Sequence, residues 1–124
     1  MLKSKIVALG VSAVVTLSFA VTAFAAPNHA YTVKGLNTSS ATSGYVGGDG
    51  IYGRYDAALR QGDNGRVTLY KQRTLLPDQA VDFIDLGTSK TYDLKTYYMN
   101  EGTLYYIKAT GDNNDEVAGN VWNY

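Results

Sequence analysis

Cysteine is absent from this 124-residue chain, proline occurs twice and histidine once. Without cysteine, no disulfide can stabilise the fold and no thiol is available for lipidation. The single histidine, His29, follows closely on an N-terminal apolar segment, and no serine stands in a recognisable nucleophile motif. Because nucleophilic catalysis needs a base beside the nucleophile, a serine hydrolase is not expected.

An excess of charge of either sign is also lacking, since 11 Lys and Arg residues balance 11 Asp and Glu residues. The basic residues do not cluster along the sequence. Tight binding to a nucleic acid depends on neutralising phosphates with Lys and Arg. We therefore expect no nucleic-acid partner.

The first 25 residues have the layout of a secretory signal peptide. Residues 1–5 carry Lys3 and Lys5, residues 6–21 are mostly apolar, and Ala23-Phe24-Ala25 supplies a small-x-small cleavage site. The pattern predicts a signal helix at 1–25 that is cleaved on export, and a single domain at 26–124. An uncleaved membrane anchor is the alternative, because the apolar segment approaches the length of a spanning helix. We expect a secreted, extracellular protein without membrane contact after cleavage.

Turn-forming residues divide 26–124 into short segments rich in Tyr, Val, Thr, Ile and Leu. This spacing is typical of an all-β domain. Seven strands are predicted, at 31–36, 51–60, 66–73, 80–86, 91–99, 103–110 and 117–123. The polar stretch 37–43 is predicted to be an exposed loop.

Residues 51–60 alternate as a strand with one buried face does. The set expected to face the core comprises Ile51, Gly53, Tyr55, Ala57 and Leu59. The set expected to face outward comprises Tyr52, Arg54, Asp56 and Arg60. No helix is predicted to cover such a sheet, so the strands are expected to form one antiparallel β-sandwich of jelly-roll or Greek-key type.

Two tyrosine pairs flank the turn at 100–102 and predict a β-hairpin between 91–99 and 103–110. A two-residue loop places Tyr97 opposite Tyr106 with both rings outward. A three-residue loop, with Gly102 in the left-handed conformation, places Tyr97 opposite Tyr105. The first register is preferred because it separates apolar from polar residues. Its expected core face comprises Tyr92, Leu94, Thr96, Tyr98, Tyr105, Ile107 and Ala109.

The aromatic residues expected to face outward are the candidate ligand-binding residues: Tyr97, Tyr106, Trp122 and Tyr124. A tyrosine ring offers a large amphipathic area at low entropic cost, which suits contact with sugars or with a protein. The alternative is structural, because cross-strand aromatic pairs also stabilise a sheet without a ligand. Trp122 has the further alternative of closing the core.

Carboxylates give little sign of catalysis or of a metal site. Asp82 and Asp85 stand three residues apart on one strand and point to opposite faces, which excludes them as a glycosidase pair. The turn at 112–116 resembles the start of an EF-hand loop, but Val117 stands where that loop needs glycine. Two interpretations of this turn remain. It forms a looser calcium site together with Asp49 or Asp63, or its Asp and Asn side chains cap the backbone of the turn itself. No other cofactor and no enzymatic activity are expected.

Two segments, Gly65-Arg66-Val67-Thr68-Leu69-Tyr70 and Gly102-Thr103-Leu104-Tyr105-Tyr106-Ile107-Lys108, carry a resemblance to a known group of proteins. The half of the chain at 64–124 resembles small secreted bacterial β-sandwich modules of the pre-peptidase C-terminal type and similar carbohydrate-binding jelly rolls. The resemblance implies a β-sandwich with an accessory, non-catalytic role. Leu104 interrupts the Gly-Thr-Tyr-Tyr pattern of that group, and its acidic metal-binding positions have no counterpart here. The resemblance therefore assigns no site.

These patterns together predict a secreted, non-catalytic bacterial protein that binds cell-wall or extracellular polysaccharide. The alternative is a role in protein interaction, as an inhibitor of an extracellular enzyme, an antagonist of competing cells or a matrix subunit. In that case the loop 37–43 or the edge of a sheet would contact the partner.

Overall fold

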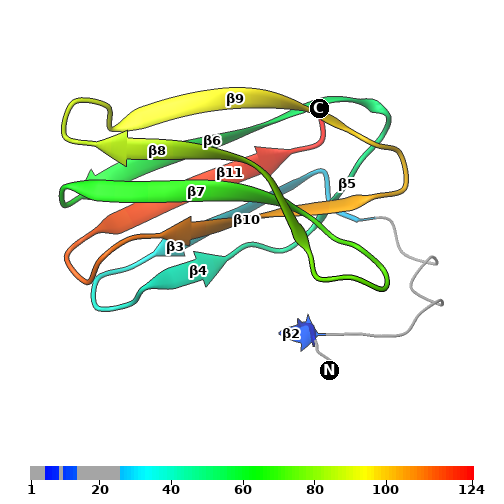
Figure 1. Cartoon of the computed structure of the whole chain (residues 1–124), viewed down its shortest axis with the longest axis horizontal. Coiled ribbons are helices and arrows are strands. Elements are labelled where there is room, and N and C mark those ends of the chain that lie inside the picture. The colour runs from blue at the N-terminus through cyan, green and yellow to red at the C-terminus, as the bar shows by residue number, and fades with distance from the viewer. Residues whose placement is uncertain (1–4, 9, 14–25) are drawn as a thin grey trace.

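The computed structural model describes residues 5–8, 10–13 and 26–124. Residues 26–124 form two antiparallel sheets that pack face to face, and no described residue is helical (Figure 1). The strands are β1 (Lys5–Ala8), β2 (Gly10–Ala13), β3 (His29–Lys34), β4 (Ser40–Thr42), β5 (Val46–Gly47), β6 (Ile51–Gln61), β7 (Asn64–Lys71), β8 (Gln79–Gly87), β9 (Tyr92–Met99), β10 (Leu104–Thr110) and β11 (Glu116–Trp122). The predicted β-sandwich is confirmed.

The predicted signal helix falls mostly outside the described residues. The two described pieces, β1 and β2, pair with each other in antiparallel register. No described residue belongs to a helix with the length and apolarity needed to cross a membrane. The signal peptide and its cleavage stay predictions.

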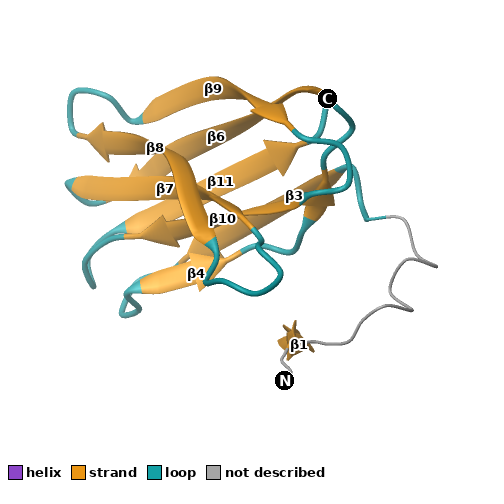
Figure 2. Ribbon diagram, turned by 45° about the vertical axis from the view of Figure 1, so that its right-hand side comes forward, coloured by secondary structure: helices purple, strands orange, loops and turns teal. Residues whose placement is uncertain are grey.

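The two sheets interleave strands that are distant in sequence. The β11 sheet has the order β3-β11-β6-β9, and the β10 sheet has the order β4-β10-β7-β8 with β5 also paired to β10. When β4 and β5 are counted as one interrupted strand, the order in both sheets is that of a jelly roll. Figure 2 shows the two layers from a second angle, with β8 beside β9 along one open side and β3 beside β4 along the other.

The core lies between the sheets and follows the period of two along each strand. On β6, Gly53, Tyr55, Ala57 and Leu59 are buried, which confirms the inner set predicted there except for Ile51, which is half exposed at the strand end. The other sheet contributes buried aliphatic and aromatic residues: Val67, Leu69, Ile84, Leu86, Tyr105, Ile107 and Ala109.

The prediction that the stretch 37–43 is an exposed loop is wrong for part of it. Ser40–Thr42 forms β4, in which Thr42 pairs with Lys108 on β10. The segment has no hydrophobic alternation because its side chains stay largely exposed at the edge of the sheet. Its backbone hydrogen bonds to β10 define the strand, and these leave no pattern in the sequence.

The predicted hairpin at 100–102 is wrong in both registers. The turn carries the chain from the β11 sheet to the β10 sheet, so β9 pairs with β6 and β10 pairs with β7. The faces predicted for β10 are correct, whereas those of β9 are reversed: Tyr97 and Met99 face the core, while Tyr92, Leu94 and Tyr98 are about half exposed. Both faces of β9 carry apolar side chains, so periodicity alone does not choose between them.

Candidate functional site

The outer face of the β11 sheet gathers most of the exposed aromatic side chains of the domain. The strand register aligns them in rows across the four strands: His29-Trp122-Arg54-Thr96, Tyr31-Asn120-Asp56-Leu94 and Val33-Ala118-Ala58-Tyr92. Tyr52 and Tyr98 form a further pair beyond the first row. Tyr31 and Tyr52 are each 65% exposed, and Tyr92, Tyr98 and Tyr124 are about half exposed. This surface is called the outer face below.

A stack of cationic and aromatic side chains crosses one end of the outer face. The imidazole of His29 on β3 stacks on Trp122 on β11, with ring centroids 5.2 Å apart and planes at 16°. From β6 on the other side, the Arg54 guanidinium lies 4.9 Å from the Trp122 ring centroid and 5.3 Å from that of Tyr124. Trp122 therefore packs between His29 and Arg54 and contacts both side chains.

A chain of hydrogen bonds runs across all four strands in the middle of the outer face. The Asp56 carboxylate, only 7% exposed, accepts bonds from the Asn120 backbone N–H (2.8 Å), the Asn120 side-chain amide (3.1 Å) and the Tyr92 hydroxyl (3.0 Å). The side-chain oxygen Oδ1 of Asn120 lies 2.9 Å from His29 Nε2. Because that oxygen can only accept, Nε2 carries the proton. Desolvation, and then the bond to Asp56, raise the pKa of Tyr92.

The four predicted site residues are not brought together. Trp122 and Tyr124 lie on the outer face, whereas Tyr97 faces the core, 6.3 Å from the ring of Tyr105. Tyr106 lies on the opposite side of the molecule, on the outer surface of the β10 sheet. The expectation that Tyr97 and Tyr106 share an outward face is wrong, because β9 and β10 belong to different sheets.

Tyr106 is engaged by its neighbours on the β10 sheet. Its ring stacks on Tyr70 at 5.2 Å with planes 8° apart, and Tyr45 meets it edge-on at 5.4 Å. Its hydroxyl donates to Asp78 Oδ2 at 2.7 Å. Desolvation and this bond raise the pKa of Tyr106. A ring packed in this way has less free surface to offer a ligand than the tyrosines of the outer face.

Sequence reasoning did not select Tyr31, Tyr52, Arg54, Tyr92 or Tyr98 as site residues. The alternation of 51–60 had already placed Tyr52 and Arg54 outward, so a signal for these two existed. The others depend on the strand order, which aligns β3, β11, β6 and β9 although they are separated along the chain.

In the acidic turn beyond β10, the Asp115 carboxylate and the backbone carbonyls of Asp112 and Asp115 accept hydrogen bonds from other groups of the protein. The Asp115 carboxylate accepts backbone N–H groups from Asp63 (2.9 Å), Asn64 (3.4 Å) and Asp112 (2.8 Å), and these bonds, the one from Asp112 first, lower its pKa. The fully buried Lys34 ammonium donates to the backbone carbonyls of Asp112 and Asp115. Lys34 thus binds the carbonyl oxygens that a bound cation would use.

No other cluster of polar side chains in the described part of the chain is a stronger candidate for a functional site. No set of three or more His, Cys, Asp or Glu side chains is placed there to hold a metal. A shallow hollow lies beside Arg66, Asp85 and Thr110, but Arg66 and Asp85 bind each other through two bonds of 2.6 and 3.0 Å.

No family model matches the sequence, and no curated protein or solved structure is significantly similar to it.

Proposed function

We propose that this is a secreted, non-catalytic bacterial protein that binds cell-wall or extracellular polysaccharide through its outer face. The observation that carries the proposal is the gathering of five exposed tyrosines on one face of one sheet: Tyr31, Tyr52, Tyr92, Tyr98 and Tyr124. Exposed aromatic surface on this scale is uncommon away from interaction sites. Tyrosine rings combine apolar faces, which suit the C–H faces of sugars, with hydroxyl groups at their edges.

The spacing of the rings supports an extended ligand. Tyr31 lies on β3 and Tyr92 and Tyr98 lie on β9, at opposite edges of the four-stranded sheet. Three inter-strand spacings separate these edges, roughly 14 Å. The rings are therefore too far apart to enclose a single small molecule, and they suit successive residues of a polymer.

The polar groups between the rings are held in fixed positions. Asn120, Asp56 and the Tyr92 hydroxyl bind one another across the centre of the face. Because these side chains are ordered before any ligand arrives, less conformational entropy is lost on binding. Asp56 uses both carboxylate oxygens in these bonds, so it supports recognition rather than acid–base hydrolysis of the polymer.

The proposal is tested by retention of the purified protein on peptidoglycan, chitin, cellulose, starch and polygalacturonate. The double variant Tyr31→Ala/Tyr52→Ala is expected to lose retention while its melting temperature stays within a few degrees, because both rings are mostly exposed. Phe83→Ala is the matched control, since Phe83 is an exposed aromatic residue on the β10 sheet. Retention on none of the polymers would refute the proposal, as would equal loss in the control.

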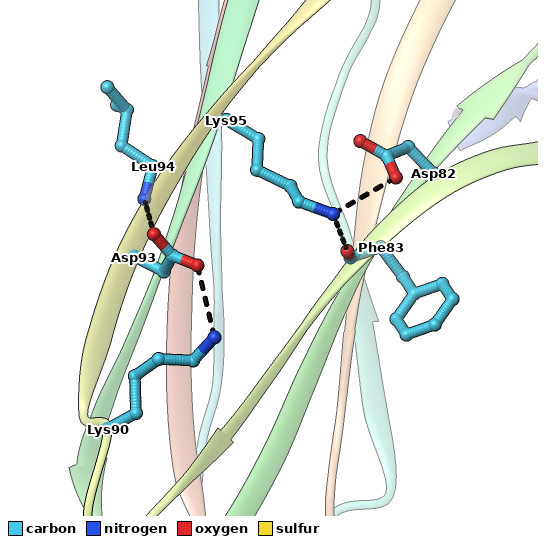
Figure 3. Close-up of polar contacts among 6 residues, drawn as sticks. All are labelled: Asp82, Phe83, Lys90, Asp93, Leu94 and Lys95. Atoms are coloured by element: carbon cyan, nitrogen blue, oxygen red, sulfur yellow. Dashed lines mark hydrogen bonds and ion pairs between the residues drawn. The ribbon is translucent and has the colours of Figure 1, made fainter.

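Contacts on the edge strands β8 and β9 argue against a function in which a strand of another chain pairs with these edges (Figure 3). Lys95 on β9 donates to Asp82 at 3.3 Å and to the Phe83 carbonyl at 3.0 Å. Asp93 accepts the Leu94 backbone N–H at 2.8 Å. Side chains thus occupy backbone groups that an added strand would need, a device that discourages edge-to-edge association.

A protein partner is the second candidate, and one observation favours it. The loop between β7 and β8 exposes two adjacent leucines, Leu75 (94%) and Leu76 (60%). Replacing both with Ser should abolish co-purification of a protein partner from culture medium if this class is correct. Retention on polysaccharide should not change, because the loop belongs to the other sheet.

A further inference from the structure

Arg54 is a cation on the outer face whose guanidinium has no acceptor among the described residues. Four other basic side chains in the described part of the chain, on either sheet or in the turn after β8, form ion pairs: Arg60 with Glu116, Arg66 with Asp85, Lys90 with Asp93 and Lys95 with Asp82. Arg54 instead packs against the rings of Trp122 and Tyr124. Its N–H donors are therefore left available to a ligand.

The aromatic stack fixes the orientation of these donors. A guanidinium over an aromatic ring gains from the cation–π attraction and sheds little hydration, while its N–H groups point outward in its own plane. His29 supports Trp122 from β3, so the stack is continuous across three strands. Arg54 is therefore held in one orientation before any ligand is bound.

Asp56, the acidic residue of β6, makes no ion pair with Arg54. Asp56 lies two residues further along β6, on the same side of the sheet. Its oxygens already accept bonds from Asn120 and Tyr92, and it is 7% exposed. Arg54 is thus a cation with free donors beside the rings of Trp122 and Tyr124.

We infer that Arg54 binds the carboxylate of a uronic acid residue, so that the ligand of the outer face is an acidic polysaccharide. This inference rests on the function proposed above. A planar guanidinium matches a planar carboxylate in a pair of parallel hydrogen bonds. Tyr124 beside it, and Tyr52 two residues before it on β6, supply rings for the sugar that carries the carboxylate and for its neighbour.

The inference is tested by the affinity of the purified protein for polygalacturonate, for the same polymer with its carboxyl groups reduced to alcohols, and for dextran sulfate. The wild-type protein should bind polygalacturonate at least tenfold more tightly than the reduced polymer, and more tightly than dextran sulfate. Added salt should weaken the binding, because exposed charges are screened. This comparison uses the wild-type protein alone and does not depend on how any variant folds.

Variants of Arg54 then test whether this residue causes the preference for the acidic polymer. Arg54→Gln should reduce affinity for polygalacturonate about tenfold, so that this variant no longer prefers polygalacturonate to the reduced polymer. Arg54→Lys should recover only part of the loss, because an ammonium lacks the planar pair of donors. Arg60→Gln is the control, since Arg60 lies on the same strand but is already paired with Glu116 at 3.2 Å.

The outcomes separate this inference from the proposed function. Equal binding to the acidic and the reduced polymer would overturn the inference and leave polysaccharide binding standing. Equal or tighter binding to dextran sulfate would overturn the choice of a carboxylate. Absence of binding to every polymer, acidic and neutral, would overturn the proposed function itself.

Discussion

Tyr97 and Tyr105 meet in the interior of the sandwich, with ring centroids 6.3 Å apart and planes at 73°. The two residues belong to facing sheets, and the turn at 100–102 that separates them spans the gap between the layers. The Tyr105 hydroxyl accepts the Asn100 backbone N–H at 2.9 Å, which anchors the turn to the core. A tyrosine-rich segment thus serves the fold at these two positions.

Substitutions of Tyr105, Tyr97 and Tyr31 should lower the free energy of unfolding by amounts that follow how deeply each ring is buried. Tyr105→Ala should lower the free energy of unfolding by about 3–5 kcal/mol, because Tyr105 is fully buried and the substitution leaves a cavity. Tyr97→Ala should cost less, since Tyr97 is only partly buried. Tyr31→Ala, at an exposed position, should cost less than about 1 kcal/mol. Urea unfolding measures all three, and a Tyr97→Ala variant as stable as Tyr31→Ala would contradict the packing described.

Lys34→Met should destabilise the protein although methionine fills a similar volume. The buried ammonium donates to the carbonyls of Asp112 and Asp115. An apolar replacement leaves the buried Asp115 carbonyl without its donor, at about 1–3 kcal/mol, whereas the Asp112 carbonyl still accepts the Asp115 backbone N–H at 3.0 Å. Lys71→Met, at a partly exposed position, is the control and should change stability by less than about 0.5 kcal/mol. Chemical unfolding of both variants measures the difference, and equal effects would contradict the proposed role of Lys34.

Calcium should not bind the turn at 112–116. Lys34 already contacts two of its carbonyl oxygens, and the Asp115 carboxylate accepts three backbone N–H groups. We therefore expect the same melting temperature with millimolar calcium and with a chelator. A rise in melting temperature with calcium, lost in Asp112→Asn, would show a calcium site.

Acid should weaken the fold partly through Asp115. Its pKa in the folded state lies below the ordinary value of 3.8, mainly because the Asp112 backbone N–H stabilises the carboxylate. A lowered folded-state pKa contributes stability that is present above the unfolded pKa and is lost as the pH falls through the folded pKa. Asp115→Asn should therefore lose less stability than the wild type between pH 5 and the acid limit of folding. Unfolding curves across that range measure this, and parallel pH profiles would contradict it.

The fold class could be predicted because its signals are local. Turn residues between short β-rich segments located seven of the nine strands that the structure describes in 29–122, and the alternation in 51–60 identified which side of β6 is buried. The two strands that were missed, β4 and β5, are short pieces with little hydrophobic pattern, and both pair with β10. They are strands because their backbones pair with β10, which the local sequence does not indicate.

The candidate site could be predicted only in part. Trp122 and Tyr124 were selected and lie on the outer face, but Tyr97 and Tyr106 were selected on the assumption of a hairpin. In a jelly roll, most consecutive strands lie in different sheets, so neighbours in sequence are poor guides to neighbours in space. Residues such as Tyr31 and Arg54 share a face through strand pairing across the β11 sheet.

The sequence by itself determined the all-β class, the sandwich architecture and the inner face of β6, because turn chemistry and the two-residue period act within a few residues. The tertiary structure decided which face of β9 is buried, which tyrosines share a surface and what occupies the acidic turn. Those outcomes depend on strand order and on contacts such as those of Lys34 with residues near 112–115, and they arise only when distant segments pack together.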